Sequence, residues 1–438
     1  MVALLIAFAA TTAHADTVDL AVDRPRKVVG FAVRGKTKLK LRLLPYLSHL
    51  EEGDYVRDRD LPEIKRALIS SDLFHSAEVT FEEAPGGVIV VATLRDRHSW
   101  LVAPTFYLQS GKRSLGVGYV ESNFRGLNQK ALLYGQIGER DNLMFGTFLD
   151  DNVKGTDLII RTDLYLYSKL IDEYVNPDDD ATSTEIGRTA RHHYLGGGFL
   201  LGWNCEWWCK LHLRLRGAYV YFDESKAPDG NPLPNPGTDG WDVTQQLWLN
   251  FDLRQQAFGV RWGPYVQLMG ETSIPGLDDF DYSSALLRAY YSWLVFGSHQ
   301  LELRTNLQIG RQLPVHEELV TGGVLDIRGY ALDQFRGDLR TMFRAEYSWP
   351  LIKISALRFR GIAFYDSAYI GFHFPRTDTK RDYLPTQTEG SSWFRNSVGL
   401  GLRMYVGWVV VPVLGLDVAY GLEGKATQLV FEVGFTDF

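Results

Sequence analysis

The chain has 438 residues with 46 basic and 53 acidic side chains, so its formal net charge is −7. This balance argues against a nucleic-acid partner, which would favour a basic surface, and the length excludes a small disulfide-stapled scaffold. Hydrophobic residues make up 45% and aromatic residues 13% of the chain, which excludes intrinsic disorder and favours strands over helices.

The mean hydropathy of −0.14 hides how the apolar residues are distributed. Beyond the N-terminus, no uninterrupted apolar run reaches the roughly 18 residues that a membrane-spanning helix needs. Helical membrane proteins are therefore excluded. A transmembrane β-barrel is not, because its strands alternate apolar and polar residues and give only a weak signal in a hydropathy window.

Residues 1–15 have the pattern of a secretory signal peptide. An apolar stretch runs from Val2 to Ala10, and Ala13 and Ala15 form an A-x-A cleavage site before Asp16. No Lys or Arg precedes the apolar stretch, so a frayed N-terminal helix is the alternative. Export would bring the chain into a compartment that permits disulfides.

A small α/β domain is expected at residues 16–97. Its elements follow the order strand, helix, helix, strand, strand, with a turn signal at Gly53-Asp54. Pro62 is compatible with the first turn of the second helix. The elements are predicted at residues 28–34, 39–47, 58–71, 77–81 and 88–94.

This domain resembles a POTRA domain. The likeness is carried by the segments VVGFAVRGKTK and LEEGDYVRDRDLPEIKRALISSDLFHSAEV, with Gly35 after the first strand, Gly53-Asp54 after the first helix and Leu73-Phe74 before the second strand. The resemblance implies a periplasmic domain that receives polypeptide segments, partly by adding a strand to an exposed sheet edge. An unrelated small α/β domain is the alternative.

From residue 98 onward the hydrophobic period is two. In the segment 210–221, one face carries Leu211, Leu213 and Leu215 and the other carries His212, Arg214 and Arg216. Strands of ten or more residues would be long for a soluble sandwich, where about five or six is usual. Transmembrane barrel strands need about 9 to 11 residues, with apolar side chains facing lipid and polar ones facing the lumen. The sequence therefore predicts a mainly β chain whose residues 98–438 form an antiparallel transmembrane β-barrel.

Sixteen barrel strands are predicted. They begin near Trp100, Leu115, Asn128, Leu143, Asp157, Arg191, Lys210, Gly240, Gly259, Asp281, His299, Leu339, Leu357, Arg395, Val410 and Thr427. An even number of strands lets the last strand close on the first. The connections alternate between short turns and longer loops, and the longer ones are expected at residues 168–189, 224–239, 311–338 and 369–392.

Three local patterns could indicate further chemistry. Cys205 and Cys209 fall in a predicted turn, where they could form a disulfide or remain as two idle thiols. A metal site is disfavoured, because no His or third Cys is adjacent. The acidic segment 178–180 is better explained as a solvated loop than as a divalent-cation site. The adhesion tripeptide Arg-Gly-Asp at 336–338 is best explained as a chance match.

The segment 321–338, TGGVLDIRGYALDQFRGD, connects predicted strands eleven and twelve. With Arg328-Gly329-Tyr330 in this position, it resembles the loop-six R-G-F/Y motif of the BamA-type outer-membrane assembly barrels, also called the bacterial surface antigen family. Ala368 stands where the family usually has Gly. Later segments resemble the family's strands in order: FRAEYSWPLI at 343–352, RGIAFYDSAYI at 360–370 and SVGLGLRMYVGWVVVPVLGLDVAYGL at 397–422.

The resemblance implies that loop six folds back into the barrel and that Arg328 pairs with inner-wall carboxylates, here Glu346 and Asp366. Alternation is consistent with this, because both carboxylates fall on the polar faces of their strands. The fork of donors on an arginine can hold two carboxylates. Gly329 would permit a tight bend, and Tyr330 would pack against the inner wall.

The C-terminus carries a candidate assembly signal. Leu429, Phe431, Val433 and Phe435 alternate, whereas Phe438 lies three residues after Phe435 and is out of phase with the strand. Barrel precursors commonly end in an aromatic assembly signal, so Phe435 and Phe438 are both candidates for the terminal anchor.

The resemblance implies an assembly, insertion or translocation factor in the bacterial outer membrane, with its POTRA domain in the periplasm. Client polypeptide would pass a seam between the first and last strands, here Trp100 to Leu108 and Thr427 to Phe438. The implied partners are unfolded outer-membrane or secreted polypeptides and outer-membrane lipids, with periplasmic chaperones or accessory lipoproteins as further candidates. No cofactor is expected, and no G-x-x-x-x-G-K-[ST] nucleotide loop occurs in the sequence.

A dedicated two-partner-type secretion pore is the main alternative. The resemblance implies that members of that branch usually have two periplasmic modules and a plug helix. In this sequence, residues 16–27 leave little room for a helix before the first strand. An enzymatic role is not expected, because no G-x-S-x-G nucleophile elbow occurs. A simple diffusion porin would leave the loop-six motif and the POTRA-like domain without a role.

Overall fold

The computed structural model describes most of the chain between residues 24 and 433. The described residues are 24–71, 73–109, 112–175, 182, 184–257, 260–323, 326–355, 357–374, 384, 393–406 and 412–433. The expected signal peptide at residues 1–15, the acidic segment 178–180, and Phe435 and Phe438 lie outside them.

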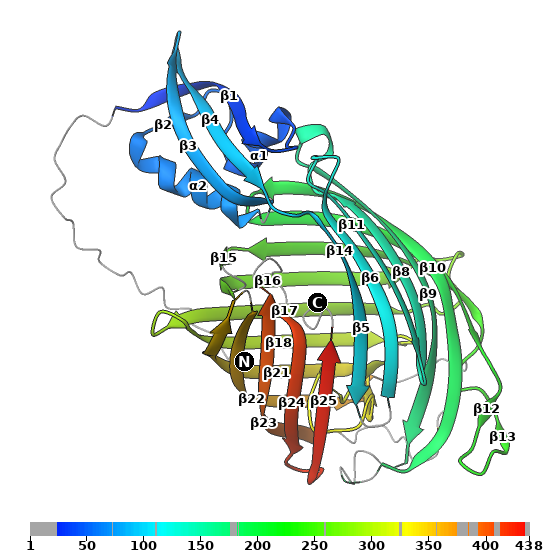
Figure 1. Cartoon of the computed structure of the whole chain (residues 1–438). Coiled ribbons are helices and arrows are strands. Elements are labelled where there is room, and N and C mark those ends of the chain that lie inside the picture. Colours follow the sequence, from blue (N-terminus) through cyan, green and yellow to red (C-terminus); the bar gives the residue numbers. More distant parts are fainter. Residues whose placement is uncertain are drawn as a thin grey trace, which may run out of the picture.

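The N-terminal domain is a four-stranded sheet with two helices (Figure 1). Its strands β1 (Arg26–Lys36), β2 (Tyr55–Val56), β3 (Phe74–Ala84) and β4 (Gly87–Asp96) lie in the order β2-β1-β4-β3. β1 and β4 are parallel, so the helices α1 (Leu44–Ser48) and α2 (Leu61–Ser70) belong to the crossover between them. Leu44, Leu68 and Phe74 are fully buried in the core that joins helices and sheet.

Two elements of this domain differ from the sequence prediction. The first helix is shorter, because Leu41–Leu43 form a separate 3-10 turn and Pro45 lies in the first turn of α1, where its fixed φ is compatible with a helix start. β3 and β4 are longer, because they form one hairpin whose turn contains Gly86 at a φ of 87°. Among the described residues, no helix is both long enough and apolar enough to span a membrane.

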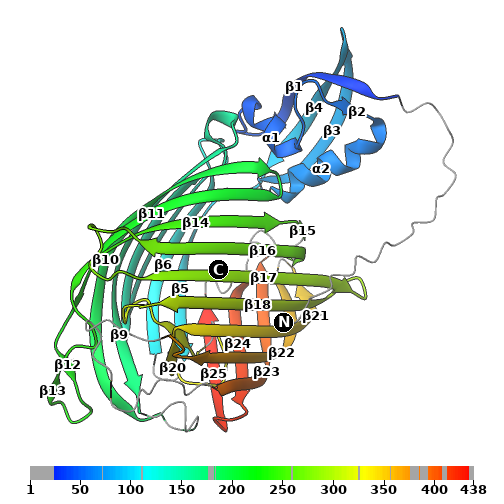
Figure 2. The same ribbon diagram turned by 180° about the vertical axis from the view of Figure 1, so that it is seen from behind.

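From Trp100 onward the chain forms a closed antiparallel barrel (Figures 1 and 2). Nineteen segments make up its described wall, of which sixteen are long strands and three, β12 (Ser225–Lys226), β13 (Pro232–Leu233) and β15 (Gln255–Ala257), are short. The expected sixteen-stranded barrel is thereby confirmed. The long strands are β5 (Trp100–Gln109), β6 (Lys112–Phe124), β7 (Gln129–Gly138), β8 (Asp141–Asp150), β9 (Leu158–Tyr174), β10 (Ile186–Glu206), β11 (Cys209–Phe222), β14 (Gly240–Asp252), β16 (Val260–Ser273), β17 (Ser283–Val295), β18 (His299–Arg311), β21 (Leu339–Ile354), β22 (Leu357–Gly371), β23 (Trp393–Val406), β24 (Pro412–Gly421) and β25 (Ala426–Val433).

The barrel is apolar outside and polar inside. On β11, Leu211, Leu213 and Leu215 are 41–48% exposed on the outer face, whereas Arg214 is 8% exposed in the lumen. A soluble sandwich would bury the leucines and expose the arginine. This inversion is the arrangement that a lipid-facing barrel requires.

One outer loop is much shorter than predicted, because β9 and β10 continue beyond the region of apolar alternation. The loop expected at residues 168–189 spans only 175–185. Polar residues continue the pairing of β9 with β10. Thr189 donates a hydrogen bond to Asp172 at 3.0 Å, and Arg188 forms a buried ion pair with Glu173 at 2.5 Å. These charged and polar residues interrupt the apolar alternation there, so a hydrophobic period did not reveal the full length of the strands.

The structure holds Cys205 and Cys209 as free thiols, the second of the two arrangements that the sequence left open. The turn between β10 and β11 pairs Glu206 with Cys209, and a register shift between Asn204 and Glu206 leaves Cys205 as the extra residue of a bulge. Cys205 is exposed and Cys209 is buried. The two cysteines are therefore not a facing pair across the hairpin.

The N-terminal domain rests against the barrel turns at one end (Figures 1 and 2). The backbone N–H of Lys40 donates to the carbonyl of Gly126 in the β6–β7 turn at 3.2 Å. The imidazole of His49 stacks on Trp207 in the β10–β11 turn, with ring centroids 5.1 Å apart and planes 14° apart. Only residues 97–99 connect β4 to β5. The domain is thus held both covalently and by contacts with the turns.

Candidate functional site in the barrel lumen

Loop six, residues 312–338 between β18 and β21, folds back into the barrel. Within it, β19 (Leu319–Thr321) pairs with β20 (Phe335–Gly337). The side chains of Ile327, Tyr330 and Phe335 are at most 2% exposed and belong to one apolar cluster with residues of β9, β10 and β11. Loop six therefore fills part of the lumen.

Arg328 is the most heavily bonded residue of this loop and is 1% exposed. Its Nε lies 2.8 Å from Oδ2 of Asp366, and its Nη2 lies 2.8 Å from Oδ1 of the same carboxylate. Its backbone N–H also donates to Asp366, at 3.2 Å. The guanidinium carbon lies 3.2 Å from the ring centroid of Phe364. Two parallel charge-assisted bonds of this kind are stronger and more directional than a single ion pair.

Two further carboxylates meet the same guanidinium. Nη1 of Arg328 lies 3.5 Å from Glu346 and 3.3 Å from Asp417. The structure thus brings together Arg328, Glu346 and Asp366, the three charged residues that the sequence resemblance assigned to this site. Asp417 was missed, although it is the single charged residue of the segment 412–422 and could have been found as a lone carboxylate in an apolar strand.

Two wall arginines complete the cluster. Nε of Arg344 lies 2.9 Å from Asp366, and the two Nη atoms of Arg403 lie 2.6 and 2.9 Å from Asp417. With Arg328 they give three guanidinium groups against the three carboxylates, so the cluster balances its charge. Removing one member of such a buried cluster leaves an uncompensated charge and costs about 3–5 kcal/mol. The arrangement fixes the loop to the wall of β21, β22 and β24.

Gly329 and Tyr330 extend this attachment to the last hairpin of the barrel. Gly329 adopts a φ of 96°, which favours glycine. The hydroxyl of Tyr330 donates to the carboxylate of Glu423, which lies in the β24–β25 turn, and its oxygen lies 3.1 Å from the carbonyl oxygen of Asn396. Tyr330 therefore connects loop six to the turn that precedes the final strand.

The tripeptide at 336–338 is buried within loop six. Arg336 is 6% and Asp338 is 1% exposed, and Asp338 accepts hydrogen bonds from the backbone N–H groups of His373 and Phe374 at 2.7 and 3.0 Å. Asp338 therefore stabilises the start of the next outer loop, and the tripeptide is not displayed to a receptor.

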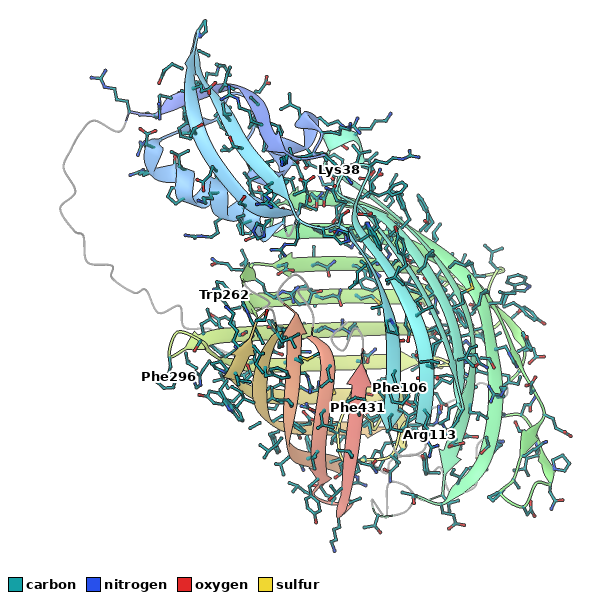
Figure 3. The ribbon with its side chains drawn as sticks, in the orientation of Figure 1. Lys38, Phe106, Arg113, Trp262, Phe296 and Phe431 are labelled. Atoms are coloured by element: carbon teal, nitrogen blue, oxygen red, sulfur yellow. The ribbon has the colours of Figure 1, made fainter. Side chains whose placement is uncertain are left out.

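The first and last strands meet at a seam, which the structure describes up to Val433. There β25 faces β5 at Phe431 with Leu108, Glu432 with Tyr107 and Val433 with Phe106. The rings of Phe106 and Phe431 lie 6.2 Å apart across this junction (Figure 3). Trp100, at the start of β5, pairs with β6 and is 49% exposed.

Comparison with solved structures identifies the same fold in other bacteria. BamA from Haemophilus ducreyi lacking POTRA domains 1–3 has a TM-score of 0.58 and 14% identity, over 93% of this chain and 84% of that one. CdiB from Acinetobacter baumannii has a TM-score of 0.58 and 14% identity, over 94% and 74%. CdiB from Escherichia coli has a TM-score of 0.56 and 12% identity, over 97% and 93%.

The sequence itself matches a known family. No curated protein sequence matches the chain. Residues 123–434, well over half of its length, match the Omp85 superfamily domain. The match includes loop six, its inner-wall partners and most of the barrel. The chain therefore belongs to the Omp85 superfamily, with a BamA-type β-barrel of the bacterial outer membrane.

Proposed function

We propose that this protein is an outer-membrane assembly factor that receives polypeptide at its N-terminal domain and inserts it through the barrel seam. The seam carries this proposal. It is the junction of the first and last strands of the barrel, and the described residues face one another there at Phe431 with Leu108, Glu432 with Tyr107 and Val433 with Phe106. First and last strands that part along this junction would offer backbone N–H and C=O groups to an incoming strand.

The N-terminal domain supports the same proposal. We infer that residues 16–97 form a single POTRA domain in the periplasm, preceded by a signal peptide at 1–15 and followed by the barrel at 98–438. β3 lies at one edge of the sheet and pairs only with β4 among the described residues. An extended client segment could add to this edge before it is transferred to the seam.

The position of loop six favours a route for the client polypeptide through the seam over a route along the barrel axis. Its core residues and the Arg328 cluster occupy the lumen, so a polypeptide that crossed the barrel axis would have to displace them. A client that pairs with the edge of β5 leaves the loop in place. The free energy of burying apolar strands in lipid would drive the step, and the outer-membrane lipids are in this sense a partner.

A two-partner-type secretion pore is the second candidate. The likeness to two CdiB structures over 94% and 97% of the chain favours it as much as the likeness to BamA favours assembly. In a secretion pore the cargo would be one specific protein and loop six would have to leave the lumen. The two functions therefore differ in the number of clients and in the route.

A crosslink at the seam tests the proposal. In a Cys205→Ser, Cys209→Ser background, Leu108→Cys with Phe431→Cys places two thiols at a facing pair of β5 and β25. The matched control, Val418→Cys with Leu429→Cys, joins β24 to β25 at a facing pair within a ladder of eight. Both pairs are oxidised in cells, and the outer-membrane proteome and the secreted proteins are compared before and after oxidation.

We expect the seam crosslink to lower the abundance of several unrelated barrel proteins and the control crosslink to leave them unchanged. Addition of reductant should restore the abundance, which shows that the substituted protein folds. Loss of one secreted protein, with the barrel proteins unaffected, would instead select the secretion pore. Unchanged levels of both would contradict a role for seam opening.

A further inference from the structure

The first part of loop six contacts strands of the wall other than those that hold Arg328. Oε1 of Glu317 lies 2.8 Å from Nη1 of Arg216 in β11. Nε2 of the neighbouring His316, whose side chain is 1% exposed, lies 3.2 Å from Oδ2 of Asp242 in β14. Two consecutive loop residues therefore bind two adjacent wall strands.

Arg216 is the centre of this second cluster. Its Nη2 lies 3.0 Å from Asp242 and 3.2 Å from Glu271 in β16, while Nη1 holds Glu317 of the loop. Asp242 also accepts a hydrogen bond from the hydroxyl of Tyr282 at 3.1 Å. One guanidinium thus joins a loop carboxylate to two wall carboxylates, which the planar fork of arginine permits.

The same side chains have the composition of a cation site. Ligand atoms of Asp242, His316 and Glu317 all lie within 4.8 Å of one another. The guanidinium of Arg216 already lies between two of these groups, at 3.0 Å from Asp242 and 2.8 Å from Glu317. Arg216 therefore takes the position that a cation would need.

The two clusters lie on different parts of the barrel wall. Counting the long strands in wall order, β14 with Asp242 is five strands from β22 with Asp366 and seven from β24 with Asp417. Leu313 and Val315 are each 3% exposed and pack in the same apolar cluster as Ile327 of the second half of the loop. Loop six is therefore attached by charged residues to two parts of the wall, with one apolar cluster between them.

We propose that Arg216, Asp242 and Glu317 are positioning residues that form a second anchor for loop six, independent of the Arg328 cluster. The loop is thus held to the wall at two places, and its first half can detach while its second half stays bound. The proposal goes beyond the assembly function, because it applies equally to an assembly factor and to a secretion pore.

Thiol labelling at two positions tests this proposal. In the Cys205→Ser, Cys209→Ser background, Val315→Cys reports on the second anchor and Ile327→Cys reports on the first, since both native side chains are buried. Glu317→Gln removes the loop charge of the second anchor. The folded protein in lipid bilayers is treated with a membrane-impermeant maleimide, and the labelling rate at each cysteine is measured.

We expect Glu317→Gln to raise the labelling rate at position 315 by about tenfold or more, because breaking a buried ion pair costs more than the 1.4 kcal/mol that a tenfold change requires. The rate at position 327 should change by less than about threefold. Glu317→Asp, which keeps the charge, should restore protection at 315. Glu206→Gln, at an exposed carboxylate in the β10–β11 turn, is the matched control and should leave both rates unchanged.

Two results would overturn the proposal. Unchanged labelling at 315 would show that Glu317 does not hold the loop, and an equal rise at 315 and 327 would show that the loop is held as one unit. Heat-modifiable gel mobility checks that each variant is folded. Single-channel conductance in planar bilayers gives a second measurement, because a detached first half of loop six should open the lumen more often.

Discussion

Gly329 in loop six and Gly421 at the end of β24 lie backbone against backbone. A Cβ on Gly329 would lie 2.6 Å from the nitrogen of Gly421, and a Cβ on Gly421 would lie 2.7 Å from the carbonyl oxygen of Gly329. No side chain fits between the two segments. The loop therefore lies directly on the strand that precedes the last one, and this proximity lets Tyr330 reach the β24–β25 turn.

Alanine at either glycine should weaken this contact. We expect Gly329→Ala to be the more severe change, because it adds a collision and also forces a non-glycine residue to a φ of 96°, which costs about 1–3 kcal/mol by itself. Gly270→Ala is the control, because its Cβ would meet nothing within 4 Å. The temperature at which the folded band disappears from unboiled gels measures the effect. Equal temperatures for Gly329→Ala and Gly270→Ala would contradict the close packing.

Substitutions in the Arg328 cluster should lower the stability by amounts that follow the bond lengths to Arg328. Asp366→Asn removes the partner of two bonds at 2.8 Å from Arg328 and of one at 2.9 Å from Arg344, so a loss of about 3–5 kcal/mol of stability is expected. Asp417→Asn should cost less of the loop attachment, because Asp417 lies 3.3 Å from Arg328. Arg328→Lys should also lower the stability, although it keeps the positive charge, since one ammonium group cannot replace the planar guanidinium that binds Asp366 through two bonds. Denaturant unfolding in detergent measures these differences, and an Arg328→Lys variant as stable as the native protein would contradict the bidentate role.

The contact between the N-terminal domain and the barrel should weaken in acid. Burial lowers the pKa of His49, and the carboxylate of Glu63 offsets only part of this effect. The docked domain therefore favours the neutral imidazole, whereas a released or unfolded domain binds a proton near the usual pKa of about 6.5. The free energy of docking is therefore most favourable above that pH and weakens progressively below it.

Spin–spin distances between the domain and the β10–β11 turn, measured at pH 7.5 and pH 5.5, check this expectation. His49→Asn cannot titrate and tolerates the positive φ of 56° at this position, so its distances should not depend on pH in this range. His75→Asn, at an exposed position in β3, should keep the native pH dependence. A native protein whose distances are the same at both pH values would refute the role of His49.

The two thiols should react differently with a maleimide. Cys205 is exposed and Cys209 is buried, and the protein contains no other cysteine. We expect one addition per folded chain by intact-mass measurement, at Cys205, and two additions after unfolding. Cys205→Ser should abolish the first addition and Cys209→Ser should not. Folded protein that takes up no maleimide, yet takes up two after reduction, would show that the thiols are joined.

Local periodicity predicted the wall of the barrel well, because most strands have an outer face of leucines and aromatics and an inner face with polar or charged residues. The starts of β5, β14, β18, β21 and β22 agree with the sequence to the residue. The extension of β9 and β10 was not predicted, since charged pairs such as Arg188 with Glu173 interrupt the apolar alternation of the two strands. The family resemblance supplied Arg328 and Asp366, whereas Glu317 and Arg216 are 101 residues apart and meet only through the path of the folded loop.

The short connection at residues 97–99 has a mechanical consequence. The two edges of the seam are attached to different parts of the molecule. β5 follows the N-terminal domain after three residues, so any rotation of the domain away from Trp207 pulls directly on the first strand. β25 follows the turn of Glu423, which Tyr330 of loop six holds. An event on one side of the membrane can thus displace one edge of the seam, and an event on the other side can displace the opposite edge.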